Sequence, residues 1–146
     1  MTTHTTHTVL RAPPEVVYDD LTRPARWREW HHASLGTEAH AAASMRVGDR
    51  FREQIKSVGL RKTLHWRVLE ADPPRCWIAA ATMDDGSTVH LRYEFAPVPE
   101  GTRYTRTLSY RLRPWSLRLL NATIGWAKVR IESRQALHCL RRRFER

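Results

Sequence analysis

Apolar and polar side chains alternate through much of the chain between residues 50 and 110, in segments separated by turn residues. A period of two predicts strands with one buried face, because successive side chains on a strand point to opposite sides. The predicted strands are residues 50–57, 60–71, 76–83, 89–95 and 104–110. Short turns such as Asp84-Asp85-Gly86 separate them, so neighbouring strands should pair as antiparallel hairpins.

The first forty residues predict two strands and two short helices. A threonine-rich strand over residues 2–11 ends at Pro13 and Pro14, and a helix over 15–21 follows, since proline is tolerated in a first helical turn. Pro24 ends that helix, because the residue before a proline avoids the helical region. A second helical piece over 25–30 and a weak strand over 33–40 complete this part.

After Pro114 the apolar period changes from two to that of a helix of roughly thirty residues. The predicted apolar stripe consists of Leu117, Leu120, Ile124, Ala127, Ile131, Leu137, Leu140 and Phe144. An antiparallel sheet with one long helix must bury one face against that helix. The fold class predicted is therefore α+β.

Length and composition limit the cellular setting. A chain of 146 residues suits one domain, residues 1–146, with one core. No apolar run approaches the length of a membrane span, and the polar start lacks the apolar segment of a secretory signal. The only cysteines, Cys76 and Cys139, are too few for a disulfide framework. We expect two reduced thiols in a cytoplasmic protein.

The net charge of +10 is carried by 22 arginines and three lysines. Such a balance is typical of proteins that bind nucleic acid or an anionic membrane, but it also fits a solvated surface. The arginines are spread over the predicted strands and helices, and only residues 141–143 form a run. No specific nucleic acid is expected as a partner; a basic surface for nucleic acid or anionic membrane stays as the alternative function.

The order of elements and several local motifs resemble the START-related superfamily, which includes polyketide cyclases, lipid-transport proteins and birch-pollen-allergen-like proteins. The matching segments are residues 12–17, 27–30, 47–51, 68–75, 93–102 and 136–140. The resemblance covers nearly the whole chain. It implies a helix-grip fold, in which a seven-stranded curved antiparallel sheet wraps one long C-terminal helix and two short helices follow the first strand. It also implies a deep, mostly apolar pocket between sheet and helix.

Polar residues on the predicted inner face are the candidates for chemistry. Alternation places Glu53 and Arg106 mid-strand between apolar neighbours, and Tyr110 on the same face as Arg106. These three are the candidate catalytic residues, with Glu53 as acid or base and Arg106 or Tyr110 polarising a carbonyl. Glu53 and Arg106 lie on strands that face each other across the cavity in the resembled fold. They could orient a ligand, satisfy each other, or be separated by a bulge that turns one to solvent.

The remaining candidates would line the pocket. The predicted ligand-binding residues are Trp30, Phe51, Ile55, Leu64, Trp66, Tyr93, Tyr104, Leu108, Asn121 and Ile124. Trp27 is interpreted as a core anchor. Eight histidines occur without metal-ligand spacing, and no glycine-rich phosphate loop is present, so neither a metal nor a cofactor is expected.

Two main functions stay open at this point. The protein could be a carrier or sensor of an apolar or aromatic molecule, or a cyclase- or dehydratase-like enzyme of secondary metabolism. A pocket is the usual location of function in such a fold.

Overall fold

The computed structural model describes residues 1–38, 44–57 and 59–145. Its strands are β1 (Thr2–Leu10), β2 (Ser34–Glu38), β3 (Arg50–Ser57), β4 (Leu60–Asp72), β5 (Cys76–Thr82), β6 (Thr88–Val98) and β7 (Gly101–Arg111). Its helices are α1 (Pro14–Leu21), the 3₁₀ helix η1 (Pro24–Glu29), α2 (Trp115–Leu120), the π-helical turn η2 (Asn121–Gly125) and α3 (Trp126–Arg143).

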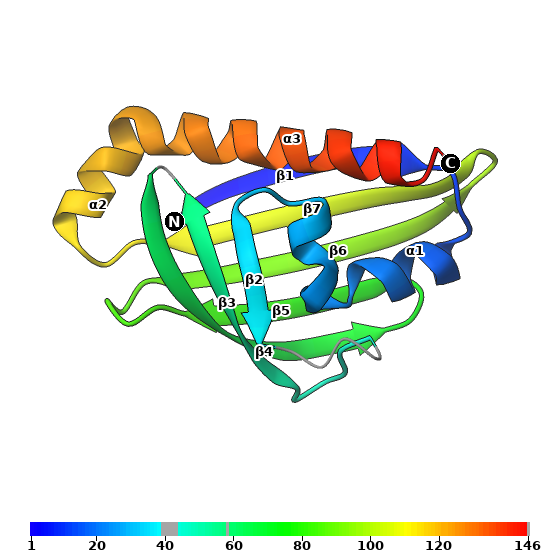
Figure 1. The fold of residues 1–146 in the computed structure, drawn as a ribbon, viewed down its shortest axis with the longest axis horizontal. Helices are drawn as coiled ribbons and strands as arrows, with labels where there is room; N and C mark the ends of the chain where they lie inside the picture. Colours follow the sequence, from blue (N-terminus) through cyan, green and yellow to red (C-terminus); the bar gives the residue numbers. More distant parts are fainter. Residues whose placement is uncertain (39–43, 58, 146) are drawn as a thin grey trace.

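The seven strands form one antiparallel sheet in the order β1-β7-β6-β5-β4-β3-β2. The sheet curves around α3, which lies along its concave face, while α1 and η1 lie near the C-terminal end of α3 (Figure 1). The predicted helix-grip fold is confirmed. Strands β3 and β7 are separated by β6, β5 and β4 in the sheet, so they lie on opposite sides of the curve.

The period-two pattern gives the buried face of β3, β4, β6 and β7 correctly. Along β7, Thr102, Tyr104, Arg106 and Tyr110 are buried, and the residues between them are at least partly exposed. Along β3, Phe51 and Glu53 are buried in the same way. Glycine is required where β6 turns into β7, because Gly101 has φ +143° and an added Cβ would lie 2.2 Å from the Leu10 carbonyl oxygen.

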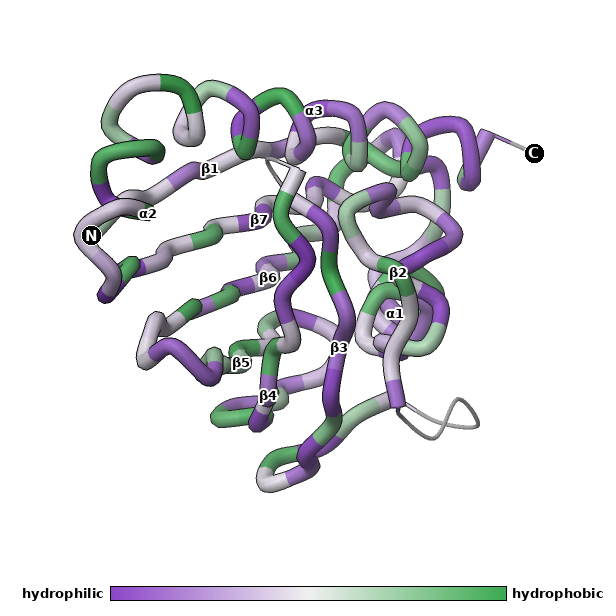
Figure 2. The backbone as a smooth tube through the Cα atoms, turned by 60° about the vertical axis from the view of Figure 1, so that its left-hand side comes forward, coloured by the Kyte–Doolittle hydropathy of each residue, from purple (hydrophilic) through white to green (hydrophobic). Residues whose placement is uncertain are grey.

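The C-terminal helix differs from the prediction of one unbroken stripe. Ile124 is 54% exposed and Ile131 is 55% exposed, so both predicted inner positions are wrong. The π-helical turn η2 takes more residues per turn than an α-helix and shifts the inward face by about one position. The residues that face the sheet are Leu117, Asn121, Gly125, Val129 and Ser133. Figure 2 shows hydrophobic positions recurring through α2 and the first turns of α3.

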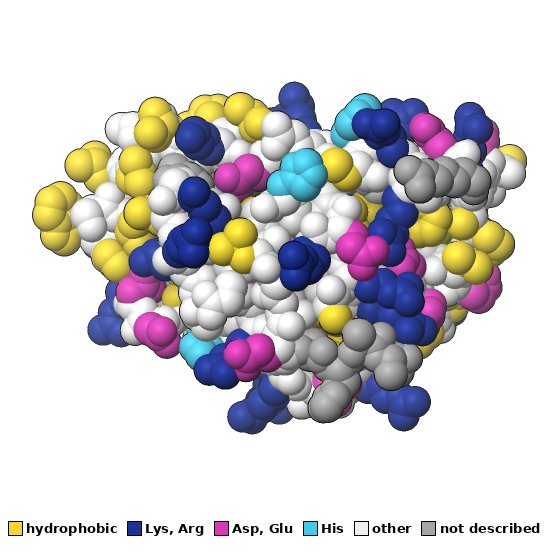
Figure 3. Space-filling view, viewed as in Figure 1, with side chains coloured by type: hydrophobic (Ala, Val, Ile, Leu, Met, Phe, Trp, Pro, Cys, Tyr) yellow, Lys and Arg dark blue, Asp and Glu magenta, His cyan; other side chains and the backbone are white. Residues whose placement is uncertain are grey.

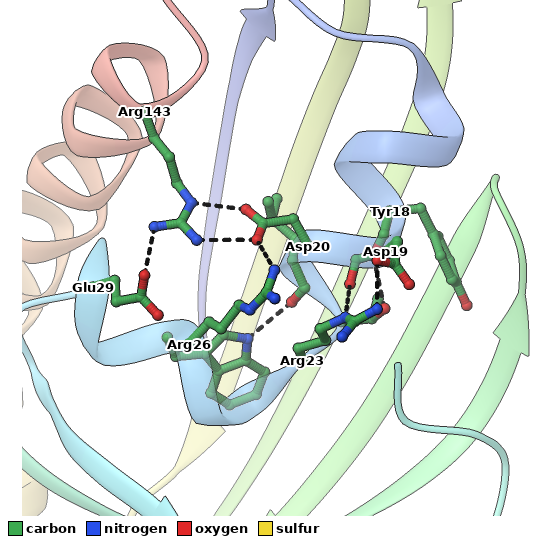
Figure 4. Close-up of polar contacts among 10 residues, drawn as sticks. Tyr18, Asp19, Asp20, Arg23, Arg26, Glu29 and Arg143 are labelled. Carbon is green, nitrogen blue, oxygen red and sulfur yellow. Dashed lines mark hydrogen bonds and ion pairs between the residues drawn. The ribbon is translucent and has the colours of Figure 1, made fainter. Parts of the chain in front are cut away.

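Ionic contacts join α1 and η1 to the C-terminal end of α3. Asp20 on α1 accepts two hydrogen bonds from Arg143 near the end of α3, at 2.8 and 3.0 Å, and one from Arg26 on η1 at 2.8 Å (Figure 4). Arg143 also donates to Glu29 at 2.9 Å. Burial disfavours the Asp20 carboxylate, but the bonds from Arg143 and Arg26 outweigh this and lower its pKa. The contacts of Arg143 with Asp20 and Glu29 therefore hold the two short helices against the last turn of α3.

The aromatic core lies between η1 and the sheet. Trp27 is 2% exposed and packs edge-on against Phe51, Trp66 and Trp77. Its indole nitrogen donates to the Leu21 carbonyl oxygen at 2.9 Å, which satisfies the one polar atom of the ring. In the part of the chain that the structure describes, no helix is long and apolar enough to cross a membrane.

Candidate functional site

A cavity of about 160 Å³ lies between the concave face of the sheet and the C-terminal helix. Most of its wall is apolar, with Leu64, Leu91 and Leu108 from the sheet and Leu117 and Val129 from the helix. Polar side chains also reach its wall from the strands, the helix and the segment after η1. These are His31, Ser34, Glu53, Ser57, Lys62, Arg106, Asn121, Glu132 and Ser133.

Nine predicted site residues line this cavity, and four do not. Those that line it are Glu53, Ile55, Leu64, Trp66, Tyr93, Arg106, Leu108, Tyr110 and Asn121. Trp30, Phe51 and Tyr104 are buried in the surrounding core instead of the cavity wall. Ile124 points to solvent because of the register shift at η2, and its predicted contact with the ligand is corrected here.

Arg106 places a buried positive charge in the cavity wall. It is 4% exposed, and its Nη1 donates to the Ser133 hydroxyl at 3.0 Å. Its Nη2 lies 3.1 Å from Nε2 of His31. It forms no salt bridge with any described residue, and its Nε has no hydrogen-bond partner among them. A buried cation without a bonded carboxylate is costly, so an acceptor from a ligand would stabilise it.

The protonation of His31 follows from its contact with Arg106. A guanidinium has only donors, so Nε2 of His31 must accept and the ring proton must sit on Nδ1. Burial and the nearby charge of Arg106, with a smaller effect of His32, lower the pKa of His31 to about 3. Its neutral form is therefore the stable one, and Nδ1 is a buried donor with no partner among the described residues. Nε of Arg106 and Nδ1 of His31 are thus two buried donors without a hydrogen-bond partner among the described residues.

Glu53 lies on the opposite side of the curved sheet and is 4% exposed. Its carboxylate accepts a hydrogen bond from the Trp66 indole at 3.1 Å. Burial raises the pKa of Glu53 to about 7, although Ser34, Trp66 and the charge of Arg106 all favour the ionised form. The carboxyl group can therefore hold or release a proton near neutral pH.

Glu53 and Arg106 face one cavity without forming an ion pair. Each is bonded to neutral partners, Trp66 for the glutamate and Ser133 with His31 for the arginine. The two charges still interact through space, since Arg106 favours the ionised form of Glu53. The cavity therefore keeps an acid or base and a hydrogen-bonding cation on separate walls.

Tyr110 and Asn121 are held by each other. The Tyr110 hydroxyl donates to Oδ1 of Asn121 at 2.6 Å, and Nδ2 of Asn121 donates to the Thr2 hydroxyl at 2.9 Å. This chain of bonds ties β7, η2 and β1 together beside the cavity. The Tyr110 proton is thus committed to Asn121 and is not free to polarise a carbonyl as predicted, and the phenol oxygen also lies 3.5 Å from Nε2 of His4.

The two side chains that contact Arg106, His31 and Ser133, were not predicted as site residues, nor were Ser34, Ser57, Lys62 and Glu132 of the cavity wall. His31 stands beside His32, and nothing in that pair of letters tells which side chain is buried. Ser133 continues the inward series Asn121, Gly125, Val129 at intervals of four, a pattern visible only once the π-helical turn is known. Among the described residues, no group of three His, Cys, Asp or Glu side chains could hold a metal ion.

An apolar cavity in a helix-grip fold defines a class of proteins that enclose small molecules between sheet and helix. A family model described as polyketide cyclase/dehydrase and lipid transport matches residues 1–145. The chain belongs to this family. No curated protein matches it at a significant level.

Solved structures show the same fold at low sequence identity. A protein from Thermus thermophilus is 20% identical with a TM-score of 0.76, and the match covers 98% of this chain and 97% of that one. A protein from Chromobacterium violaceum is 21% identical with a TM-score of 0.69, over 99% and 97% of the two chains. DynU16, a protein in the dynemicin biosynthetic locus, is 17% identical with a TM-score of 0.69. That match covers 98% of this chain and 47% of DynU16.

Proposed function

We propose that the protein binds one small apolar or aromatic molecule in the cavity, and that a carbonyl or carboxylate of this molecule faces Arg106. The observation that carries the proposal is the buried guanidinium of Arg106 in the wall of a mostly apolar cavity. Small-molecule sites combine apolar walls with a few polar groups that fix orientation. A carbonyl or carboxylate would accept a hydrogen bond from the Arg106 guanidinium in the cavity wall, whereas a ligand with only donor groups could not.

The cavity volume limits the size of the part that is enclosed. An engineered apolar cavity of roughly 150 Å³ encloses one benzene molecule, and the cavity here is about 160 Å³. It therefore holds about one aromatic ring or a short aliphatic chain as it stands. A larger ligand, such as a substituted naphthalene, would place one ring in the cavity and extend toward α2, where the cavity wall includes the partly exposed residues Leu60 and Leu117.

Three naphthalenes that differ in one substituent test this proposal: naphthoate, acetylnaphthalene and ethylnaphthalene. Their binding is followed by quenching of tryptophan fluorescence at physiological salt. We expect naphthoate and acetylnaphthalene to bind with one-to-one stoichiometry and ethylnaphthalene to bind at least roughly tenfold more weakly, because only the first two offer an acceptor. Equal affinities for the three would remove the role of Arg106, and no saturable binding of any would remove the ligand site.

The second candidate function is cyclase- or dehydratase-like catalysis in secondary metabolism. The observation that favours it is the raised pKa of Glu53, about 7, in the cavity that also contains Arg106. Arg106 would stabilise negative charge on a carbonyl oxygen while Glu53 takes the proton from the neighbouring carbon. The protonated Glu53 would then give its proton to a leaving hydroxide, so that the overall change is loss of water.

A phenyl-substituted β-hydroxy ketone is a direct probe of this chemistry, because loss of water gives a conjugated enone that absorbs in the near ultraviolet. We expect Glu53→Gln to abolish product formation while retaining affinity for acetylnaphthalene. Binding without turnover in the unmodified chain would favour the carrier or sensor function over the enzyme.

We also place the protein in the cytoplasm. Cys76 and Cys139 are both free thiols in the structure, which suits a reducing compartment.

A further inference from the structure

Large apolar side chains are exposed on the outer side of the segment from α2 to the start of α3. They are Trp115 at 72% exposure, Leu119 at 59%, Ile124 at 54%, Trp126 at 45% and Ile131 at 55%. In Figure 3, hydrophobic side chains gather at the end of the molecule where α2 lies and along the adjoining part of the long helix. Exposed apolar groups gathered in this way mark an interaction site more often than scattered ones do.

These side chains are not part of the core. The same helical segment turns Leu117, Asn121, Gly125 and Val129 toward the cavity, so its inner face is already occupied. The π-helical turn η2 places Ile124 outside instead of inside. The segment is therefore apolar on both sides, and the side chains on its outer side are left to solvent.

Basic residues surround the exposed apolar side chains. Residues 111–131 contain five basic residues, Arg111, Arg113, Arg118, Lys128 and Arg130, and no acidic residue. All five are exposed, and none forms a salt bridge with a described residue. Five positive charges within residues 111–131, where the next acidic residue along the chain is Glu132, give this end of the molecule a positive potential.

We propose that this docking surface, formed by the five apolar and five basic residues named above, binds an anionic lipid membrane from the water side. Tryptophan is favoured at the membrane interface because its ring is apolar and its indole nitrogen can stay hydrated. A segment with tryptophan, leucine and isoleucine next to arginine and lysine suits binding parallel to a membrane plane. The charge of the surface is complementary to anionic headgroups.

The charge and the apolar side chains of this surface argue against two other partners, a second copy of the chain and nucleic acid. A symmetric dimer would bring the same patch of two copies together and place their ten positive charges near one another. Nucleic acid would complement the charge but would leave the exposed tryptophan, leucine and isoleucine side chains without an apolar partner. An anionic membrane satisfies both kinds of residue at once.

The position of the surface suggests what docking does. Leu117 and Leu120 of α2 line the cavity, and Leu60 of β4 lines it while being 38% exposed. Docking through α2 therefore brings this end of the cavity to the lipid, so that an apolar molecule can pass without crossing water. This consequence rests on the proposed ligand site, whereas the docking itself does not.

Sedimentation of the full chain with vesicles tests the docking. One set of vesicles is pure phosphatidylcholine, and the other is a mixture of phosphatidylcholine and phosphatidylserine. We expect binding to the mixed vesicles at physiological salt and at least roughly tenfold weaker binding to the neutral ones. No added cavity ligand is needed, so failure of the ligand proposal would leave this result unchanged.

Matched variants assign the binding to the surface. Trp115→Ser combined with Leu119→Ser should weaken binding at least roughly tenfold, whereas Val16→Ser with Leu69→Ser, also exposed apolar positions, should not. Arg118→Gln combined with Arg130→Gln should weaken it roughly fivefold for each charge. The control for charge is Arg141→Gln with Arg142→Gln, which removes as much charge from the far end of the same helix.

Several outcomes would overturn the proposal. Absence of binding to the mixed vesicles would do so, as would equal binding to neutral ones. Equal losses in the Arg118/Arg130 and Arg141/Arg142 variants would show attraction by net charge alone. Elution of the chain as a dimer that Leu119→Ser dissociates would assign the surface to a second copy.

Discussion

Glu53, which is buried, and His31, which is half-buried, are titratable residues whose effects on stability oppose each other. The pKa of Glu53 is about 7 in the folded chain and 4.5 ordinarily. Between these two pH values Glu53 is therefore protonated in the folded chain and ionised in the unfolded chain. The pKa of His31 is about 3 in the folded chain and 6.5 ordinarily. Between these two pH values His31 is therefore neutral in the folded chain and protonated in the unfolded chain. Between pH 4.5 and 6.5 the two contributions to the pH dependence of the free energy of unfolding cancel.

Replacing Glu53 with glutamine should remove the contribution of Glu53 to the pH dependence of the free energy of unfolding. The variant keeps an oxygen for the Trp66 indole but cannot ionise. Its stability relative to the unmodified chain should be nearly unchanged below pH 4.5, rise as pH increases, and level off above pH 7. The gain at the plateau should be on the order of 3 kcal/mol. Urea denaturation of both chains across this range measures the difference, and a difference independent of pH would show that the Glu53 carboxyl is not buried.

Arg106 should determine which ligands bind. Arg106→Met keeps a long apolar side chain but removes the charge and the donors. Binding of naphthoate should weaken at least roughly thirtyfold, since hydrogen bonds to charged groups contribute about 2 kcal/mol or more, while ethylnaphthalene should bind equally or better. Arg103→Met, an exposed position on the same strand, is the control. If the two variants bound naphthoate alike in a fluorescence titration, Arg106 would not contact the ligand.

At the scale of secondary structure, the C-terminal end of α3 depends on the part-buried ionic contacts of Arg143. Arg143→Gln removes both bonds to Asp20 and the bond to Glu29, leaving Asp20 with Arg26 alone as a charged partner. We expect a loss of about 1–3 kcal/mol at pH 7. Because the pKa of Asp20 is lowered, this contribution should disappear as pH falls below the ordinary range of a carboxyl group. The neighbouring exposed Arg142→Gln should change thermal stability little; equal losses would refute a specific role for Arg143.

The sequence predicts the strands well but predicts the register of the C-terminal helix wrongly. Alternation survives in β3, β4, β6 and β7 because one face of each strand packs in the core and the other meets solvent. The segment from α2 to the start of α3 has apolar residues on both sides, so the sequence does not show which side faces the sheet. Ile124 and Ile131 face outward because η2 changes the register, and no residue type in the sequence predicts a π-helical turn.

At the scale of the whole molecule, the candidate site is only partly predictable. Alternation placed Glu53, Arg106 and Tyr110 on inner faces, and the structure places all three in the cavity wall. Their hydrogen bonds could not be predicted, because Arg106 meets residues 75 and 27 positions away in the sequence, His31 and Ser133. Such contacts follow from the curvature of the sheet around the helix, which a local pattern does not describe.

The central claim is that the cavity encloses a small apolar molecule with an acceptor group. It is tested most directly by native mass spectrometry of the chain mixed with equal amounts of naphthoate, acetylnaphthalene and ethylnaphthalene. The comparison is with Val129→Trp, which fills the cavity, and with Arg134→Trp, which adds the same ring at an exposed position of α3. We expect one adduct of naphthoate or acetylnaphthalene in the unmodified chain and in Arg134→Trp, and none in Val129→Trp. Equal adducts in all three chains, or none in any, would contradict the central claim.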